Sequence, residues 1–129
     1  DSTVNWTLKK DLIHKNLTDS FYTEKCVSLI SDRIKKPVSL YRAYSHAFHQ
    51  NQSTHIHEDI NATHTALFYV NPVYNPNWMG GTLIWTDKPN YIEFKPNRLV
   101  IFKAELKHCG VMFQNSLDYR IQCVWKINI

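Results

Sequence analysis

The stretch VSLYRAYSHAF, residues 38–48, marks the place where the sequence pattern changes from helical to β-rich. Before it, apolar residues recur at helical spacing over residues 18–35, and Thr18, Asp19 and Ser20 are candidate helix N-caps. After it, short β-rich segments alternate with turn residues. We expect strands at residues 38–48, 54–59, 64–71, 81–86, 91–94, 98–103, 109–114 and 119–128. One helix followed by these short strands predicts a mainly β fold, an antiparallel barrel or a jelly roll.

Size and composition are those of a small globular protein. The chain has 129 residues, and 43% of them are hydrophobic, which suffices for one domain with a core. We interpret residues 1–129 as a single domain, in which residues 1–37 are a lead-in strand and helix and residues 38–128 form the β core. The formal net charge is +4, but the basic residues are scattered rather than massed, so charge does not favour a nucleic-acid partner. No apolar run reaches membrane-spanning length, and we expect no membrane partner.

The three cysteines indicate a reducing environment. Cys26, Cys109 and Cys123 cannot all pair within the chain, and none belongs to a CxxC motif. We therefore expect a cytoplasmic location. The bias toward Asn, Lys and Ile suggests an AT-rich genome, such as that of a phage or a bacterium, and a phage protein would lie in the host cytoplasm.

The candidate chemistry begins at His57-Glu58-Asp59, which is followed much later in the chain by His108. Because side chains alternate along a strand, His57 and Asp59 would share one face of the expected strand 54–59. The third ligand would come from a distant strand folded back against the first. Two imidazoles and one carboxylate form the 2-His-1-carboxylate triad, which binds non-haem Fe(II) and leaves coordination positions open for chemistry.

A second arrangement of histidines stays open. His55 would share a strand face with His57, so these two and His108 could hold a metal in a non-catalytic, cupin-like barrel. The usual cupin pattern has a Glu four or five residues after its second His, and this chain has none there. Such a barrel has no need of Arg120, so the role of this arginine distinguishes the cupin-like barrel from the catalytic Fe(II) site. Ordinary surface or core positions are expected for the remaining histidines, His14, His46, His49 and His64.

Six sequence elements in order resemble the Fe(II)/2-oxoglutarate-dependent dioxygenases, and among them the prolyl 4-hydroxylase-like branch. They are HED at residues 57–59, TALFYVN at 65–71, WMGGTL at 78–83, RLVIF at 98–102, His108, and YRI at 119–121. The resemblance covers roughly residues 38–128, and residues 12–34 are similar to the family's lead-in strand and first helix. It implies a double-stranded β-helix, with two antiparallel sheets in a distorted barrel and one supporting N-terminal helix.

The resemblance also implies an activity. His57, Asp59 and His108 would hold Fe(II), with 2-oxoglutarate and O2 as cosubstrates and ascorbate as a further reductant, and no catalytic residue is implied beyond the metal centre. The products would be succinate, CO2 and a hydroxylated substrate, for which a prolyl residue in a protein or peptide is our first choice. A small molecule or a nucleic acid remains the alternative substrate, because motifs for the reaction do not encode the substrate.

The family positions for 2-oxoglutarate can be carried over in the same way. Arg120 would bind the distal carboxylate, for which its planar, always charged fork is suited. Tyr69 would add its hydroxyl, Thr65 a second one, and Tyr44 would lie near the cosubstrate, with Tyr41 fitting almost as well. An ordinary surface ion pair for Arg120 and a core position for Tyr69 are the alternatives.

Two residues depart from, or bear on, this pattern. Gln122 stands where many relatives have a small hydroxyl residue two positions after the Arg, which puts a further cosubstrate contact in doubt. Cys109 directly follows the distal His, and strand alternation would point it away from the metal as a small buried residue.

Overall fold

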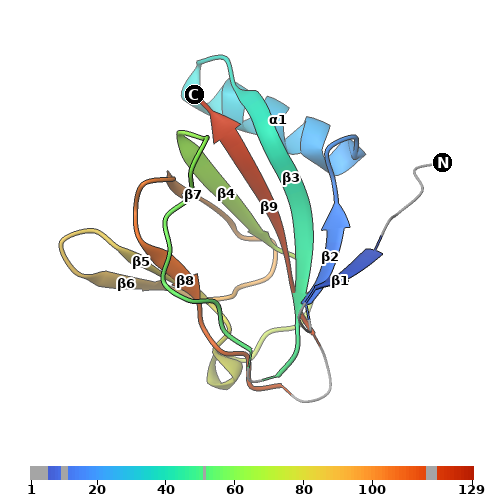
Figure 1. Cartoon of the computed structure of the whole chain (residues 1–129), viewed down its shortest axis with the longest axis vertical. Coiled ribbons are helices and arrows are strands. Elements are labelled where there is room, and N and C mark those ends of the chain that lie inside the picture. The colour runs from blue at the N-terminus through green and yellow to red at the C-terminus, as the bar shows by residue number, and fades with distance from the viewer. Residues whose placement is uncertain (1–5, 10–11, 51, 116–118) are drawn as a thin grey trace.

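The fold is two antiparallel β-sheets with one helix, a double-stranded β-helix or jelly roll, as expected from the sequence (Figure 1). The structure, a computed structural model, describes residues 6–9, 12–50, 52–115 and 119–129. Its elements in chain order are β1 (Trp6–Lys9), β2 (Leu12–Asn16), α1 (Phe21–Ile34), β3 (Ser39–Phe48), β4 (His64–Tyr69), η1 (Pro76–Trp78), β5 (Thr82–Trp85), β6 (Pro89–Ile92), β7 (Leu99–Lys103), β8 (His108–Gly110) and β9 (Arg120–Asn128). None of the helices in these ranges is long and apolar enough to cross a membrane.

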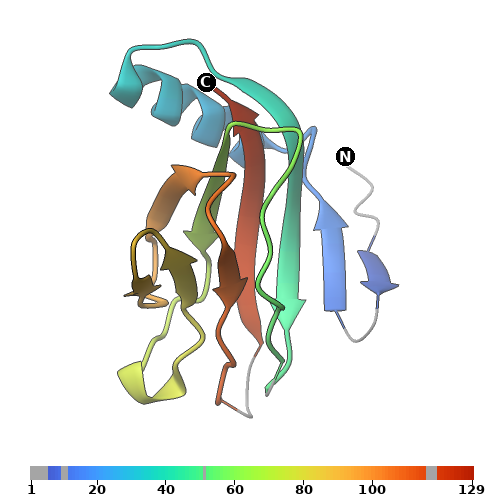
Figure 2. The ribbon, with the colours of Figure 1, turned by 60° about the vertical axis from the view of Figure 1, so that its left-hand side comes forward.

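The two sheets differ in size. The larger has the strand order β1-β2-β3-β9-β4-β7, and the smaller has the order β6-β5-β8. The long antiparallel pair of β3 and β9 forms the centre of the larger sheet, with Ser39 opposite Asn128 at one end and Phe48 opposite Arg120 at the other. Figure 2 shows these two strands side by side along the length of the molecule, with the smaller sheet to one side.

Alternation along the central strands divides the core into two layers. On β9, Val124 belongs to the cluster that also includes Ile84 of the smaller sheet, so this layer lies between the sheets. The next residue, Trp125, belongs to the cluster that includes Ile30 of α1, on the opposite face. The Trp125 indole N–H donates to the hydroxyl of Thr23 at 2.9 Å and ties the helix to the sheet. One face of the larger sheet therefore meets the smaller sheet, and the other meets the helix.

The helix begins later than its predicted start at residue 18. Ser20 is the N-cap, and its hydroxyl accepts the backbone N–H of Tyr22 at 3.2 Å. Thr18 and Asp19 instead lie in a turn closed by the hydrogen bond from the Ser20 N–H to the Leu17 carbonyl at 3.0 Å. One of the three candidate caps is thus correct, and the turn explains why the helix cannot start earlier.

The strand predictions hold with one clear error. Residues 54–59 do not form a strand, and within this segment only His57 makes a β-bridge, to His108. The segment hydrogen-bonds to β8 and to the turn before it at irregular spacing, so a regular ladder does not form. Two strands rather than one precede the helix, and β6 begins two residues before the predicted 91–94 strand. The remaining predicted strands are present with shifted ends.

Candidate metal centre

Three side chains that could hold a metal meet at one point of the fold. One ligand atom each from His57, Asp59 and His108 lies within 4.8 Å of the other two. The backbones of His57 and His108 exchange two hydrogen bonds, of 3.0 and 2.9 Å, and the Asp59 N–H donates to the Ala104 carbonyl at 2.9 Å. These backbone bonds fix the distant segments against each other. The pairing of His57 and Asp59 with His108 that the sequence suggested therefore exists in space, although an irregular segment rather than a strand supplies the first two.

Backbone carbonyls orient both imidazoles. The Nδ1 atom of His57 lies 2.7 Å from the His55 carbonyl oxygen, and that of His108 lies 2.8 Å from the Leu106 carbonyl oxygen. A carbonyl only accepts hydrogen bonds, so each Nδ1 donates to its carbonyl and each ring is turned with Nε2 away from that carbonyl. Both Nε2 atoms face Asp59, at 3.8 Å for His57 and 3.3 Å for His108. This is the ring orientation that metal binding through Nε2 requires.

Asp59 is held as a carboxylate by its neighbours. Thr65 donates its hydroxyl to Oδ2 at 2.5 Å, and the Lys126 ammonium pairs with Oδ1. Burial alone would raise the pKa of Asp59, but hydrogen bonds from His108, Lys126 and Thr65 outweigh it and keep the pKa below its usual range. Two imidazoles and one ionised carboxylate are the donor set that suits Fe(II).

A small cavity of about 70 Å³ opens from these three residues. Its wall is polar on several sides, and includes Tyr44, Thr65, Thr82, Gly110, Gln122 and Lys126. Tyr44 is buried, and burial together with the nearby Asp59 charge raises its pKa to about 12. Tyr41 is 52% exposed and is not part of the wall, so the structure separates the two tyrosines that the sequence left undecided. His55, the ligand of the cupin-like alternative, contributes its carbonyl to His57 and is absent from the metal-ligand group found among the described residues.

Arg120 is a buried cation beside this cavity. Its side chain is 1% exposed, and the guanidinium lies 4.9 Å from the ring centre of Phe48 and 5.1 Å from that of Phe94. Nε donates to the Gly80 carbonyl and one terminal nitrogen to the Gly81 carbonyl. Burial lowers its pKa to about 10, which still leaves it charged at neutral pH.

No carboxylate among the described residues pairs with Arg120, and its NH1 nitrogen has no hydrogen-bond acceptor among them. The nearest free space lies toward Gly110, where a Cβ atom would be only 3.7 Å from NH1. Gly110 itself lines the cavity. The surface ion pair considered for Arg120 is therefore wrong, and the unpaired edge of the guanidinium is placed to meet an anion.

Tyr69 and the glycine pair support the guanidinium. Tyr69 is fully buried, with its ring centre 5.8 Å from the Arg120 guanidinium, and its hydroxyl lies 2.8 Å from that of Thr82, which lines the cavity. Burial raises the pKa of Tyr69, so it keeps its proton. Gly80 has a φ of 79°, and a Cβ on Gly81 would collide with the Ile92 carbonyl oxygen and lie 2.7 Å from the Tyr91 ring. Only glycine at both positions lets the chain bring these carbonyls to Arg120.

Two residues of the wall were missed as site residues from the sequence. Lys126 was not considered, and Gln122 was considered only as a departure from the family pattern. Both lie on β9 at even spacing from Arg120, so strand alternation puts all three on one face of the sheet. That spacing was the available signal. Cys109, by contrast, is buried and lies outside the cavity wall, as expected.

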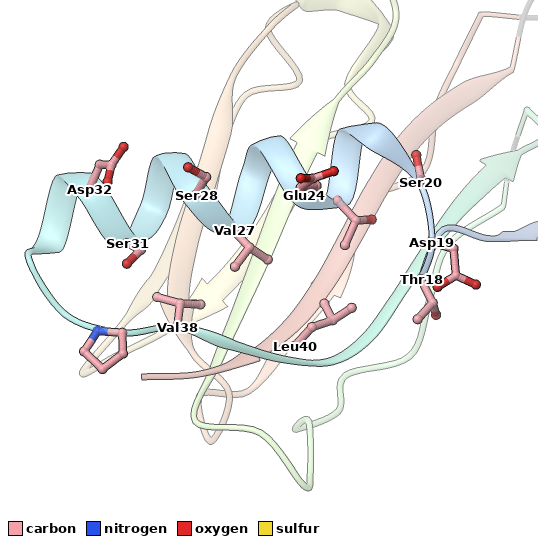
Figure 3. A pocket seen from close by; sticks show the side chains of 12 residues that line it. Thr18, Asp19, Ser20, Glu24, Val27, Ser28, Ser31, Asp32, Val38 and Leu40 are labelled. Carbon is pink, nitrogen blue, oxygen red and sulfur yellow. The ribbon is translucent and has the colours of Figure 1, made fainter.

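A second, more open hollow of about 680 Å³ lies between α1 and the start of β3 (Figure 3). Its side chains include Glu24, Asp32, Val38 and Leu40. None of the candidate site residues belongs to it, and it contains no histidine or cysteine. The metal-ligand group found among the described residues therefore lies outside this hollow.

Comparison with solved structures finds the same fold in Fe(II)/2-oxoglutarate oxygenases. A 2OG-Fe(II) oxygenase family oxidoreductase from Burkholderia pseudomallei superimposes with a TM-score of 0.75 at 8% identity, over 97% of this chain and 72% of that one. HygX from Streptomyces hygroscopicus, with nickel and 2-oxoglutarate bound, gives 0.71 at 8% identity, over 97% and 73%. A prolyl hydroxylase from Trichoplax adhaerens, in complex with a hypoxia inducible factor peptide fragment, gives 0.68 at 15% identity.

The last comparison covers 89% of this chain and 62% of the Trichoplax adhaerens chain, so this protein spans less than two thirds of that enzyme. No protein-family model matches the sequence, and no curated protein matches it. The resemblance inferred from the sequence is thus confirmed at the level of the fold, which is that of the 2-oxoglutarate oxygenases, prolyl hydroxylases among them.

Proposed function

We propose that this protein is an Fe(II)- and 2-oxoglutarate-dependent dioxygenase and that residues 1–129 act as one such domain. The observation that carries the proposal is the combination of a His-Asp-His ligand set with an unpaired buried arginine beside the same cavity. A structural metal needs only the ligand set and not the buried arginine. A buried cation without a counter-ion is unfavourable unless a ligand supplies the anion.

In this proposal His57, Asp59 and His108 hold Fe(II) through Nε2 of each imidazole and one carboxylate oxygen. The carbonyls of His55 and Leu106 fix the ring orientations, and Thr65 fixes the carboxylate. Bound at the triad, Fe(II) with 2-oxoglutarate would supply the oxidative decarboxylation with O2 that yields succinate, CO2 and a hydroxylated substrate.

Arg120 would bind the distal carboxylate of 2-oxoglutarate through its NH1 edge. Phe48, Phe94 and Tyr69 enclose the guanidinium, which excludes water and strengthens the ion pair. The hydroxyls of Tyr69 and Thr82 are bonded to each other, and one of them can turn to the same carboxylate. Tyr44 would line the cosubstrate site from β3, and ascorbate would serve as an external reductant.

For the substrate we propose a prolyl residue in a protein or peptide, with the enzyme acting in the cytoplasm. The peptide complex of the Trichoplax adhaerens prolyl hydroxylase supports the substrate class, and the three free cysteines support the reducing compartment. A small molecule or a nucleic acid is the alternative substrate. A non-catalytic metal-binding barrel is the alternative function, and it leaves the burial of an unpaired Arg120 without a purpose.

Turnover tests the proposal. Protein loaded with Fe(II) in air is expected to convert 2-oxoglutarate to succinate, and proline-containing peptides should make this conversion faster. The peptides should gain 16 Da, which mass spectrometry measures. His108→Ala should abolish both signals, because it removes one of three metal ligands. Absence of succinate from protein that binds metal stoichiometrically would overturn the proposal.

A further inference from the structure

A second buried cation lies in the wall of the same cavity. Lys126 is 8% exposed, projects from β9 on the face that carries Arg120, and pairs with Asp59. An ammonium group has three N–H donors. The described residues give it one acceptor, the Asp59 carboxylate. Lys126 therefore has donors left for a ligand that enters the cavity.

The charges at the site show what kind of ligand this would be. The formal charges of a divalent metal, Asp59, Arg120 and the 2-oxoglutarate dianion cancel one another. Lys126 adds one positive charge to this neutral set. The exposed Arg42 lies opposite Lys126 in the β3–β9 ladder, with its guanidinium 4.6 Å from the ring centre of Tyr44, so it offers Lys126 no counter-charge. An unbalanced buried cation favours an anionic ligand, because pairing offsets the cost of removing its charge from water.

Gln122 gives independent support for a ligand at this wall. Its side chain is 8% exposed and lines the cavity, between Arg120 and Lys126 along β9. Its Oε1 atom is buried and has no hydrogen-bond partner within the described part of the chain. A buried acceptor left unpaired is unfavourable, because it has lost its hydrogen bonds to water. A ligand that brings an N–H or O–H group into the cavity would satisfy it.

We propose, on the basis of the function proposed above, that Lys126 selects a substrate in which the residue to be hydroxylated carries a free carboxylate. Two kinds of molecule share this chemistry, a free amino acid and the carboxyl-terminal residue of a peptide. Lys126 pairs with the carboxylate, and Gln122 Oε1 accepts a hydrogen bond from an N–H group of the bound ligand at the same wall. Lys126 thus determines specificity, while the His57-Asp59-His108 set and Arg120 serve the reaction itself.

The test compares a peptide carboxylate with its carboxamide and with a free amino acid. N-acetylglycyl-L-proline, its carboxamide and free L-proline are titrated by calorimetry into protein loaded with Zn(II), which is redox-silent, and 2-oxoglutarate. Native protein should bind one of the two carboxylates at least about tenfold more tightly than the carboxamide, the size expected for a hydrogen bond between charged groups. Preference for L-proline would assign a free amino acid, and preference for the acetylated dipeptide would assign a peptide end.

Variants show whether Lys126 is the cause. Lys126→Met keeps the length of the side chain without its charge and should remove the preference, whereas Lys126→Arg should retain it. Lys103→Met, on the exposed side of β7, is the matched control and should leave the preference unchanged. Thermal unfolding of each variant checks that it is folded. If Lys126→Met does not fold, the test rests on Lys126→Arg, which should retain the preference.

Three results would overturn the proposal: equal affinity of native protein for carboxylates and carboxamide, a preference that survives in Lys126→Met, or no binding of any of the three ligands. The function proposed above is read separately, from 2-oxoglutarate turnover. Turnover without a carboxylate preference would defeat only the role of Lys126. A preference without turnover would defeat the oxygenase proposal and leave the anion site.

Discussion

Thr65 and Asp59 are joined by a hydrogen bond of 2.5 Å from the threonine hydroxyl to the carboxylate Oδ2. Asp59 lies on an irregular segment, whereas Thr65 is a fully buried residue of β4, which pairs with β7 and β9 in the larger sheet. The bond therefore ties the Asp59 side chain directly to the larger sheet. Lys126 pairs with the other carboxylate oxygen, Oδ1.

Loss of this bond should weaken metal binding without unfolding the protein. Thr65→Val keeps the shape of the side chain but removes the hydroxyl, and groups of this kind typically change metal affinity by about 10–100-fold. Competition with a chelator measures the affinity for Fe(II) or Zn(II) in the variant. Thr65→Ser keeps the hydroxyl and should bind metal nearly as well as the native protein. Equal affinity of Thr65→Val and native protein would show that Asp59 is positioned by other contacts.

Two glycines near Arg120, Gly81 and Gly110, should respond differently to alanine. Gly81→Ala brings a methyl group into the Ile92 carbonyl oxygen and the Tyr91 ring, so we expect a loss of about 2 kcal/mol or more in the free energy of unfolding. In Gly110→Ala the nearest atom would be the Thr54 hydroxyl at 3.5 Å, an ordinary contact, and stability should change little. Urea denaturation of both variants measures the difference. Similar stabilities would contradict the packing described around Arg120.

Acid should weaken the fold through Asp59. The pKa of Asp59 in the folded protein lies below its ordinary value of about 3.9, so its interactions contribute stability that is fully present above that value. This contribution is lost as the pH falls through the folded pKa. In metal-free buffer, the urea midpoint of native protein should therefore fall below about pH 4 more steeply than that of Asp59→Asn. Parallel curves would mean that the Lys126 and Thr65 contacts do not stabilise the carboxylate.

Two of the free thiols should be unreactive in the folded protein. Burial, with the neighbouring Cys123, raises the pKa of Cys26 to about 12, and burial raises that of Cys123 to about 11. The thiolate is the reactive form, and at pH 8 it is a very small fraction of either group. Iodoacetamide should therefore modify both far more slowly in native than in urea-unfolded protein, as followed by mass spectrometry. Equal rates would contradict the raised pKa values of these two thiols.

The sequence predicted the parts of the fold that depend on local pattern. Alternating apolar residues identified β3, β4 and β9, and Ser20 was among the three candidate caps. The strand expected at 54–59 was wrong because its backbone partners are set by β8 and its preceding turn, which no local pattern reveals. The ligand pair still converges, since one bridge at His57 is enough to place it.

In the candidate site, too, the sequence predicted the residues with a distinctive local pattern and missed those that depend on packing. The HxD motif, the distal His and Arg120 could be chosen because their chemistry and order are distinctive. Lys126 could not, since a lysine near the end of a strand is usually a solvated surface residue, and only the packed structure shows it beside Asp59. The unpaired state of Arg120 likewise depends on every neighbour that the fold brings near it. The hydrogen-bond partners and counter-charges of Lys126 and Arg120 are set by the packed core and not by the local sequence.

The most direct measurement is an anaerobic titration of the protein with Fe(II) and 2-oxoglutarate, followed by the visible metal-to-ligand charge-transfer band of a chelated keto acid. We predict a band in native protein that is absent in His108→Ala. Arg120→Ala should need about a hundredfold more 2-oxoglutarate, in line with truncating one partner of a buried charge pair, and Arg120→Lys should be intermediate. Stoichiometric metal binding without a band would contradict the oxygenase assignment and favour a metal-binding barrel.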